Sequence, residues 1–269
     1  RNTGEPSKRD VPTAGYPWTS LGACDSGGGD DGGGGGGGGG DPAEPQAISI
    51  YGAWHCGDDY CTWSRERDLD EFDAQNHWLI DRDASGCDYQ IPGDCQPSVN
   101  LVVLSFVHPL RLLHKTTDSQ TLDGAPRGMT QDVVNYFKNQ GIRVMLSIGG
   151  ITYVDPWNQA LAENAWQLGL NAAAVAADLG VGIEIDYEDN QNPDLVGLQR
   201  FIDAYRSVHS YDVTGTNHAA RLTIDLAAGA RWLIALTERA TAEWLLTDPG
   251  HRVLDYANAM VTPRQSAAD

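Results

Sequence analysis

Three acidic residues, Glu184, Asp186 and Glu188, alternate with apolar and aromatic residues in the segment 181–188. Alternate side chains on a β-strand share a face, so the spacing predicts three carboxyl groups that point the same way. On a strand buried on both faces such groups repel one another and lose hydration, and the cost falls if one of them holds a proton near neutral pH. A protonated carboxyl beside an ionised one is what cleavage of a glycosidic bond requires. The alternative is a solvated acidic face, which is typical of antiparallel sheets.

A pair of glycines ends a second apolar segment, in the motif Ser147-Ile148-Gly149-Gly150. Glycines at the carboxyl end of a strand allow another backbone or a ligand to come close. A simple turn from strand to loop would leave the same pattern. Asp225, in a later apolar segment, could face the interior of the fold or serve a structural role.

The elements that must position these residues follow a regular alternation of strands and helices. Helices are predicted to start at Thr130, at Asp155-Pro156 and at Asn192-Pro193, where capping residues precede apolar residues at helical spacing. The first of them is expected to end at Gly141. Strands are predicted at 47–53, 99–107, 142–148, 181–187, 221–227 and 253–261. This alternation, with strands that are apolar on both faces, is typical of a parallel α/β sheet covered by helices.

Two topologies fit that alternation, a doubly wound sheet and a (β/α)8 barrel. No G-x-G-x-x-G motif follows the first strand, so the sequence does not support a dinucleotide site. A (β/α)8 barrel over residues 46–269 would be incomplete, because only about six of its eight strands are predicted, and both topologies stay open at this point. The last residues, 265–269, show no capped helix, which suggests a truncated domain. Residues 1–45 include nine consecutive glycines, Gly32 to Gly40, and are expected to form a disordered segment and flexible linker.

Composition excludes several classes of protein. The net charge of −19 argues against binding to duplex nucleic acid and to anionic membrane surfaces, both of which need a basic face. The sequence contains no apolar segment long enough to span a membrane. Its seven histidines lack the spacing of a metal motif, so we expect neither a metal nor another cofactor.

The cysteines give information on the cellular location of the protein. Leu21-Gly22-Ala23-Cys24 resembles the lipobox of bacterial lipoproteins, so secretion is expected, with a lipid anchor at Cys24 as an open alternative. In an exported protein, short local loops favour disulfides between Cys56 and Cys61 and between Cys87 and Cys95. A zinc site is the competing interpretation, but zinc motifs use tighter and matched cysteine pairs.

Taken together, the two motifs resemble those of glycoside hydrolase family 18, the chitinases and their relatives. That family carries S-x-G-G on its third barrel strand and D-x-x-D-x-D-x-E on its fourth. Residues 147–150 match the first motif fully, and Asp186 and Glu188 match the end of the second. Val181 and Glu184 stand where the family has aspartate. After the sixth strand, Thr262 occupies the position of a family tyrosine.

The resemblance implies an α/β fold of the TIM type over residues 46–269, an incomplete (β/α)8 barrel with about six of the eight strands. It also implies a role for each matching residue. Glu188 would be the general acid, Asp186 would orient the N-acetyl group of the substrate, and Glu184 would share the proton of Asp186. The acetamide oxygen of the substrate would attack the anomeric carbon, giving retention without a cofactor. The implied partner is chitin or an N-acetylglucosamine oligosaccharide bound by a monomer. The residues expected to contact this sugar are Trp54, Tyr153, Tyr187 and Met260.

Three alternatives stay open. A carbohydrate-binding protein on the same barrel would bind the sugar without cleaving it, and the departures at Val181, Glu184 and Thr262 favour it. An endo-β-N-acetylglucosaminidase would use the same residues on glycoproteins. A magnesium site at Glu184, Asp186 and Glu188 is less favoured, because alternate residues of one strand are about 7 Å apart.

Overall fold

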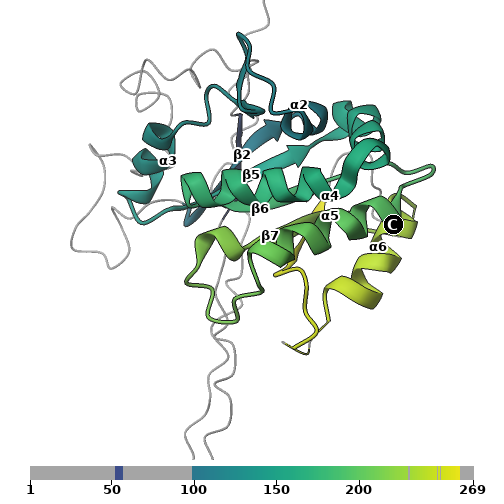
Figure 1. Cartoon of the computed structure of the whole chain (residues 1–269). Coiled ribbons are helices and arrows are strands. Elements are labelled where there is room, and N and C mark those ends of the chain that lie inside the picture. Colours follow the sequence, from purple (N-terminus) through teal and green to yellow (C-terminus); the bar gives the residue numbers. More distant parts are fainter. Residues whose placement is uncertain (1–51, 57–98, 230, 247, 249, 261–269) are drawn as a thin grey trace, which may run out of the picture. The chain divides into compact units, whose positions relative to one another are not determined.

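A single parallel sheet organises the part of the chain that the computed structural model describes, residues 52–56, 99–229, 231–246, 248 and 250–260 (Figure 1). Its strands pair in the order β1-β2-β5-β6-β7-β8, and every pair is parallel. They are β1 (Gly52–Cys56), β2 (Leu101–Val107), β5 (Arg143–Gly149), β6 (Gly182–Asp186), β7 (Leu222–Ala227) and β8 (Ala257–Met260).

The strand order follows the order of the chain. A doubly wound sheet reverses direction at a switch point, and the described strands contain no such reversal. Sequential parallel winding is the order found in a (β/α)8 barrel. The six strands are therefore compatible with part of such a barrel, and no pairing closes β8 onto β1 within the described residues.

Two predicted strand boundaries are wrong. The first strand was predicted to end at residue 53, but β1 continues to Cys56, and residues 47–51 lie outside the described part. The last strand was predicted from residue 253, but β8 begins only at Ala257. The reason is that Val253 and Leu254 donate their amides to the carbonyl of Trp244, which ties them to the preceding turn. The predicted division into 1–45 and 46–269 also falls outside the described residues.

The helices begin close to the predicted positions. In α3 (Gln131–Lys138), Thr130 is the N-cap, and its hydroxyl accepts the amide of Val133 at 3.3 Å. Helix α4 (Val154–Leu179) is long and is kinked at Asn164. Helix α5 (Leu195–Val208) is capped by Asp194, whose carboxylate accepts the amide of Gly197 at 2.8 Å, rather than by Asn192.

Several shorter elements complete the described part. Helix α2 (Pro109–Leu113) follows β2, and a small antiparallel hairpin pairs β3 (Thr121–Leu122) with β4 (Ala125–Pro126). Helix α6 (Ile234–Arg239) continues into a π-helical turn, Ala240–Trp244. None of the described helices is long and apolar enough to cross a membrane.

The two faces of the sheet differ in chemistry. One face packs against helices α3, α4 and α5 in a continuous hydrophobic core, and Figure 1 shows α4 and α5 running together along it. The core residues of this face include Val102, Leu104, Val144, Leu146, Ile148, Ile183, Ile185, Leu222 and Ile224. The opposite face has a small apolar cluster of Leu101, Val103 and Met145 near the amino ends of the strands. Polar residues take over on that face toward the carboxyl ends.

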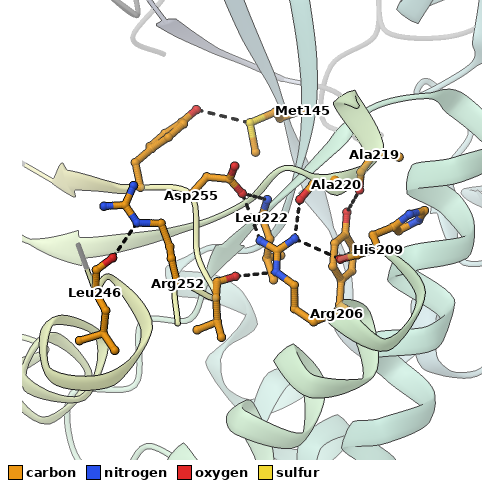
Figure 2. A network of polar contacts seen from close by, with 12 residues as sticks. Met145, Arg206, His209, Ala219, Ala220, Leu222, Leu246, Arg252 and Asp255 are labelled. Atoms are coloured by element: carbon orange, nitrogen blue, oxygen red, sulfur yellow. Dashed lines mark hydrogen bonds and ion pairs between the residues drawn. The ribbon is translucent and has the colours of Figure 1, made fainter. Parts of the chain in front are cut away.

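An arginine from α5 joins the elements at the amino-terminal edge of the sheet (Figure 2). Arg206 donates to the carbonyls of Val253, at 2.6 Å, and Ala220, at 2.5 Å, and pairs with Asp255 at 3.1 Å. The same carboxylate oxygen of Asp255 accepts the amide of Leu222 at 2.7 Å. Helix α5, the start of β7 and the segment before β8 are thereby held together.

We expect Arg206→Met to lower the free energy of unfolding by about 3–5 kcal/mol, because the substitution leaves three carbonyls and Asp255, whose side chain is only 11% exposed, without their partner. Urea denaturation at pH 7 measures the change. Arg200→Met, at an exposed position of the same helix, is the control and should stay within about 0.5 kcal/mol of the parent. Equal effects of the two substitutions would contradict the proposed anchoring.

Candidate active site

The carboxyl groups of the D-x-D-x-E-like segment lie on β6 and just beyond it. Glu184 and Asp186 belong to the strand, and Glu188 follows two residues after its end. All three side chains are buried, with exposed fractions of 0%, 5% and 9%. Burial of three carboxyl groups on one segment requires neighbours that compensate for the lost hydration.

Those neighbours come from the strands on both sides. In the register of the sheet, Glu184 lies beside Ser147 of β5 and Thr223 of β7, which places the three residues in one row. Asp225 follows two residues after Thr223, on the same face, and lies beside Asn258 of β8. The amide of Asn258 donates to Glu184 at 2.6 Å. Four adjacent strands thus contribute to one buried polar cluster, which we call the carboxyl cluster: Ser147, Glu184, Asp186, Glu188, Thr223, Asp225 and Asn258.

Four oxygen atoms of the carboxyl cluster are fully buried without a hydrogen-bond partner among the described residues. They are Oγ of Ser147, Oδ1 of Asp186, Oγ1 of Thr223 and Oδ1 of Asp225. Buried polar atoms are costly unless they meet a partner, so such atoms call for an explanation. Their concentration on one face of three neighbouring strands marks this face as the place where a polar ligand would find hydrogen-bonding groups.

The carboxyl cluster retains protons at neutral pH. Burial raises the pKa of Asp186 to about 8, and the nearby charges of Glu188 and Glu184 add to this effect. Burial, followed by the charges of Glu184 and Asp186, also raises the pKa of Asp225 well above its ordinary value. A hydrogen bond to Glu184 favours the protonated form of Asp225 as well. The carboxyl cluster can therefore both donate and accept a proton near pH 7.

The glycine pair brings the end of β5 against Asp186. Gly149 and Gly150 have φ angles of +122° and +89°, and the amide of Gly150 donates to the backbone carbonyl of Asp186 at 2.9 Å. A Cβ atom on Gly149 would lie 2.0 Å from that carbonyl oxygen. Only glycine permits this contact, so the motif beginning at Ser147 fixes the backbone position of Asp186.

Tyr187 lies on the other face of β6. It is fully buried, and its ring packs 5.6 Å from that of Trp157. Its hydroxyl donates to the side chain of Asn158 and accepts the amide of Asp194 at 2.9 Å. Tyr187 therefore connects β6 to the starts of α4 and α5. Its predicted contact with a sugar stays a prediction.

Tyr153 and Met260 are the other residues expected to contact sugar whose side chains the structure describes, and both lie at the ends of their elements. Tyr153 closes the short helical turn Ile151–Tyr153, is half-buried, and has its ring centroid 5.0 Å from that of His108 and 6.4 Å from that of Phe106. Met260 ends β8 beside Ala227 and is half-buried. These positions leave the predicted sugar contacts of Tyr153 and Met260 untested.

The remaining predicted residues lie partly or wholly outside the described part. The backbone of Trp54 pairs with Val103 in the sheet, and its side chain is outside that part. Cys56 ends β1, while the other cysteines, Cys24, Cys61, Cys87 and Cys95, lie outside, so the disulfide pairing stays a prediction. Within the described residues, no three histidine, cysteine or acidic side chains are arranged to hold a metal ion.

Sequence reasoning found the β6 carboxyl groups but missed Thr223 and Asn258 and left Asp225 open. Each of these is a single polar residue in an apolar strand, and no local motif distinguishes it. The available signal is that Thr223 and Asp225 are two residues apart, like the acidic residues of β6, and so share a face.

Comparison with known proteins assigns no family. No protein-family model matches the chain, and no curated protein matches it. Twelve chains of solved structures match, among them a chitinase from Rhizomucor miehei with 18% sequence identity and a TM-score of 0.32. The match covers 48% of this chain and 41% of the chitinase, so the chain spans less than half the length of that protein.

The raised pKa of Asp186 predicts how stability depends on pH. Between its ordinary value of 3.8 and about 8, the folded protein holds a proton at Asp186 that the unfolded chain has released. The free energy of unfolding should therefore fall as pH rises from 5 to 8. In Asp186→Asn this fall should be smaller, because asparagine does not titrate.

Urea denaturation of both proteins at pH 5 and pH 8 measures this difference. Asp203→Asn, at an exposed position of α5, is the matched control and should keep the slope of the parent. If Asp186→Asn keeps the parental slope as well, Asp186 does not hold the proton.

Proposed function

We propose that this chain is a glycoside hydrolase of the family 18 type, which cleaves β-1,4-linked N-acetylglucosamine polymers such as chitin. The observation that supports this most is the carboxyl cluster, a set of buried groups that hold protons at the carboxyl ends of sequentially wound parallel strands. Enzymes built on (β/α)8 barrels carry their catalytic residues at this end of the strands. The S-x-G-G motif against Asp186 is consistent with the same function.

In the proposed reaction, Glu188 protonates the glycosidic oxygen while the acetamide oxygen of the substrate attacks the anomeric carbon. The bond to the leaving sugar breaks, and an oxazolinium ion forms within the substrate. Asp186 orients the acetamide by accepting its N–H. This donor favours the ionised form of Asp186, so the proton held there shifts toward Glu188. Water then opens the oxazolinium ion, with Glu188 as the base, and the anomeric configuration is retained.

In this proposal, Glu184 and Asp225 hold the side chain of Asp186 in position. Glu184 is one methylene longer than the aspartate of the family motif, and it hydrogen-bonds both Asn258 and Asp225. Asp225 acts in its protonated form, as a donor to Glu184. These two residues are positioning residues, because neither is assigned a contact with the substrate.

A non-catalytic carbohydrate-binding protein is the second candidate. The observation in its favour is that Val181 and Glu184 depart from the family motif, although Glu188 is retained. An endo-β-N-acetylglucosaminidase is a variant of the first proposal with a glycoprotein substrate. Secretion, a lipid anchor at Cys24 and the monomeric state belong to the proposal as predictions.

Glu188→Gln tests the assignment of the acid. Glutamine keeps the shape of the side chain and removes the exchangeable proton, so hydrolysis of a labelled chito-oligosaccharide should slow by about 10²–10⁴-fold. Binding of the oligosaccharide, measured by calorimetry, should persist. An unchanged rate would place the acid elsewhere, and a parent chain that binds the sugar without cleaving it would support the second candidate.

A pair of substitutions at Asp225 tests its protonated form. Asp225→Asn retains a donor for Glu184, so the hydrolysis rate at pH 7 should stay within about threefold of the parent, whereas Asp225→Ala should lower it by about tenfold or more. The dependence of the hydrolysis rate on pH distinguishes positioning from a general loss of structure, because Asp225→Asn should keep the parental dependence around pH 7. Equal losses in both variants would show that Asp225 acts as an ionised group instead.

A further inference from the structure

Positive charge gathers at the amino-terminal edge of the sheet, opposite the carboxyl cluster. Arg143 is the first residue of β5, Arg221 directly precedes β7, and His218 begins the short helical turn His218–Ala220 between α5 and β7. Lys138 ends α3 nearby. The whole sequence has only 18 lysines and arginines and a net charge of −19, so a group of cations on one edge is unusual in this chain.

The two guanidinium groups converge on the loop that carries Gly215. A Cβ atom at Gly215 would lie 3.1 Å from Nη2 of Arg221 and 4.0 Å from Nη1 of Arg143. The two nitrogens are therefore within about 7 Å of each other, close enough for both to reach one small anion. Gly215 has a φ of +63°, and the absence of a side chain there leaves room beside the guanidinium groups.

These cations are not neutralised by neighbouring acids. Within the described residues, no carboxylate lies within 4.0 Å of Arg143, Arg221 or Lys138. The carboxylic acids whose charge reaches them are Asp212 and Asp255, and Tyr256 interacts with both arginines.

Both acids are already bound elsewhere. The carboxylate of Asp212 accepts the amides of Thr214 and Asn217 within its own loop, at 2.9 Å and 2.7 Å. Asp255 pairs with Arg206 at 3.1 Å. Neither acid can therefore move to the guanidinium groups without losing these bonds.

The electrostatics of the group agree with the geometry. Burial, followed by the charge of Arg221, lowers the pKa of Arg143. Burial, followed by the charges of Arg143, Lys138 and Arg221, lowers the pKa of His218. Arg143 and Arg221 thus repel one another in a half-buried position, whereas the lowered pKa of His218 keeps its imidazole neutral near pH 7. A bound anion would relieve the repulsion between the two guanidinium groups.

Lys138 and Arg221 also have contacts of their own. The ammonium group of Lys138 donates to the carbonyl of Leu179 at 3.4 Å, at the end of α4. The guanidinium of Arg221 lies 5.8 Å from the ring centroid of Tyr256 and hydrogen-bonds the hydroxyl of that residue. Arg143 and Arg221 remain the pair with donors toward Gly215, and Lys138 contributes its charge from a greater distance.

We propose that Arg143 and Arg221 form a binding site for a tetrahedral oxyanion of the phosphate class, at the edge of the sheet opposite the carboxyl cluster. The two guanidinium groups provide the planar forks of donors that suit phosphate oxygens. The proposal does not depend on the function proposed above, because it uses none of the residues of the carboxyl cluster.

Calorimetric titration of the 269-residue chain with inorganic phosphate tests this site, at pH 7 and at constant ionic strength set with chloride. We expect saturable binding of one phosphate per chain. Arg143→Gln and Arg221→Gln should each weaken it by about tenfold or more, because each removes a charge-assisted contact. Arg143→Lys should have an intermediate effect, since it keeps the charge and loses the fork.

Arg200→Gln is the control, because it removes one positive charge from an exposed position of α5. It should bind phosphate as the parent does, and an equal loss there would overturn the proposal by showing a general charge effect. Absence of saturable binding to the parent would overturn it too. Thermal unfolding in phosphate-free buffer identifies any variant that has lost its fold. If both glutamine variants unfold, Arg143→Lys and a rise of the parental melting temperature with phosphate decide the question.

Discussion

Burial of several carboxyl groups on adjacent strands is the constraint on which the rest of the structure depends. Glu184, Asp186 and Asp225 have lost almost all contact with solvent, and each would repel the others if all were ionised. Three features reduce this repulsion: protons retained on the carboxyl groups, the hydrogen bond between Glu184 and Asp225, and the hydrogen bond that the amide of Asn258 donates to Glu184. A group of acids that shares protons in this way is poised for acid–base chemistry near neutral pH.

The surrounding fold supplies stabilising contacts that offset the cost of burying the carboxyl cluster. The helix-covered face of the sheet buries a continuous apolar core, while the rigid contact between Gly150 and the carbonyl of Asp186 holds the strand end in place. At the other edge of the sheet, Arg206 anchors α5 to the segments that lead into β7 and β8 (Figure 2). The register that places Asp225 beside Asn258 thus rests on contacts that lie away from the carboxyl cluster.

Local sequence patterns predicted most of the elements, because their signals are short-range. Thr130 followed by Val133, Val134 and Phe137 specifies a capped amphipathic helix, and the structure confirms it. The late start of β8 was not predictable in this way, since it depends on hydrogen bonds from Val253 to the distant Trp244.

The contrast between local patterns and long-range contacts also applies to the candidate active site. The spacing of Glu184 and Asp186 identified β6, whereas Asn258 became visible only once the strands were placed side by side. A single polar residue in an apolar strand has no local signature of function. The closure of a barrel likewise depends on pairing between remote strands, which no local pattern encodes.

The central claim is that the carboxyl cluster holds a proton at neutral pH. A carbon-13 NMR titration of the aspartate and glutamate carboxyl carbons, with the Asp186 signal assigned by its loss in Asp186→Asn, tests it most directly. We predict that the Asp186 signal titrates with an apparent pKa near 8 and that its midpoint is displaced when Glu188 is replaced by glutamine. Titration of the Asp186 carboxyl below pH 5, with no response to Glu188→Gln, would contradict the claim.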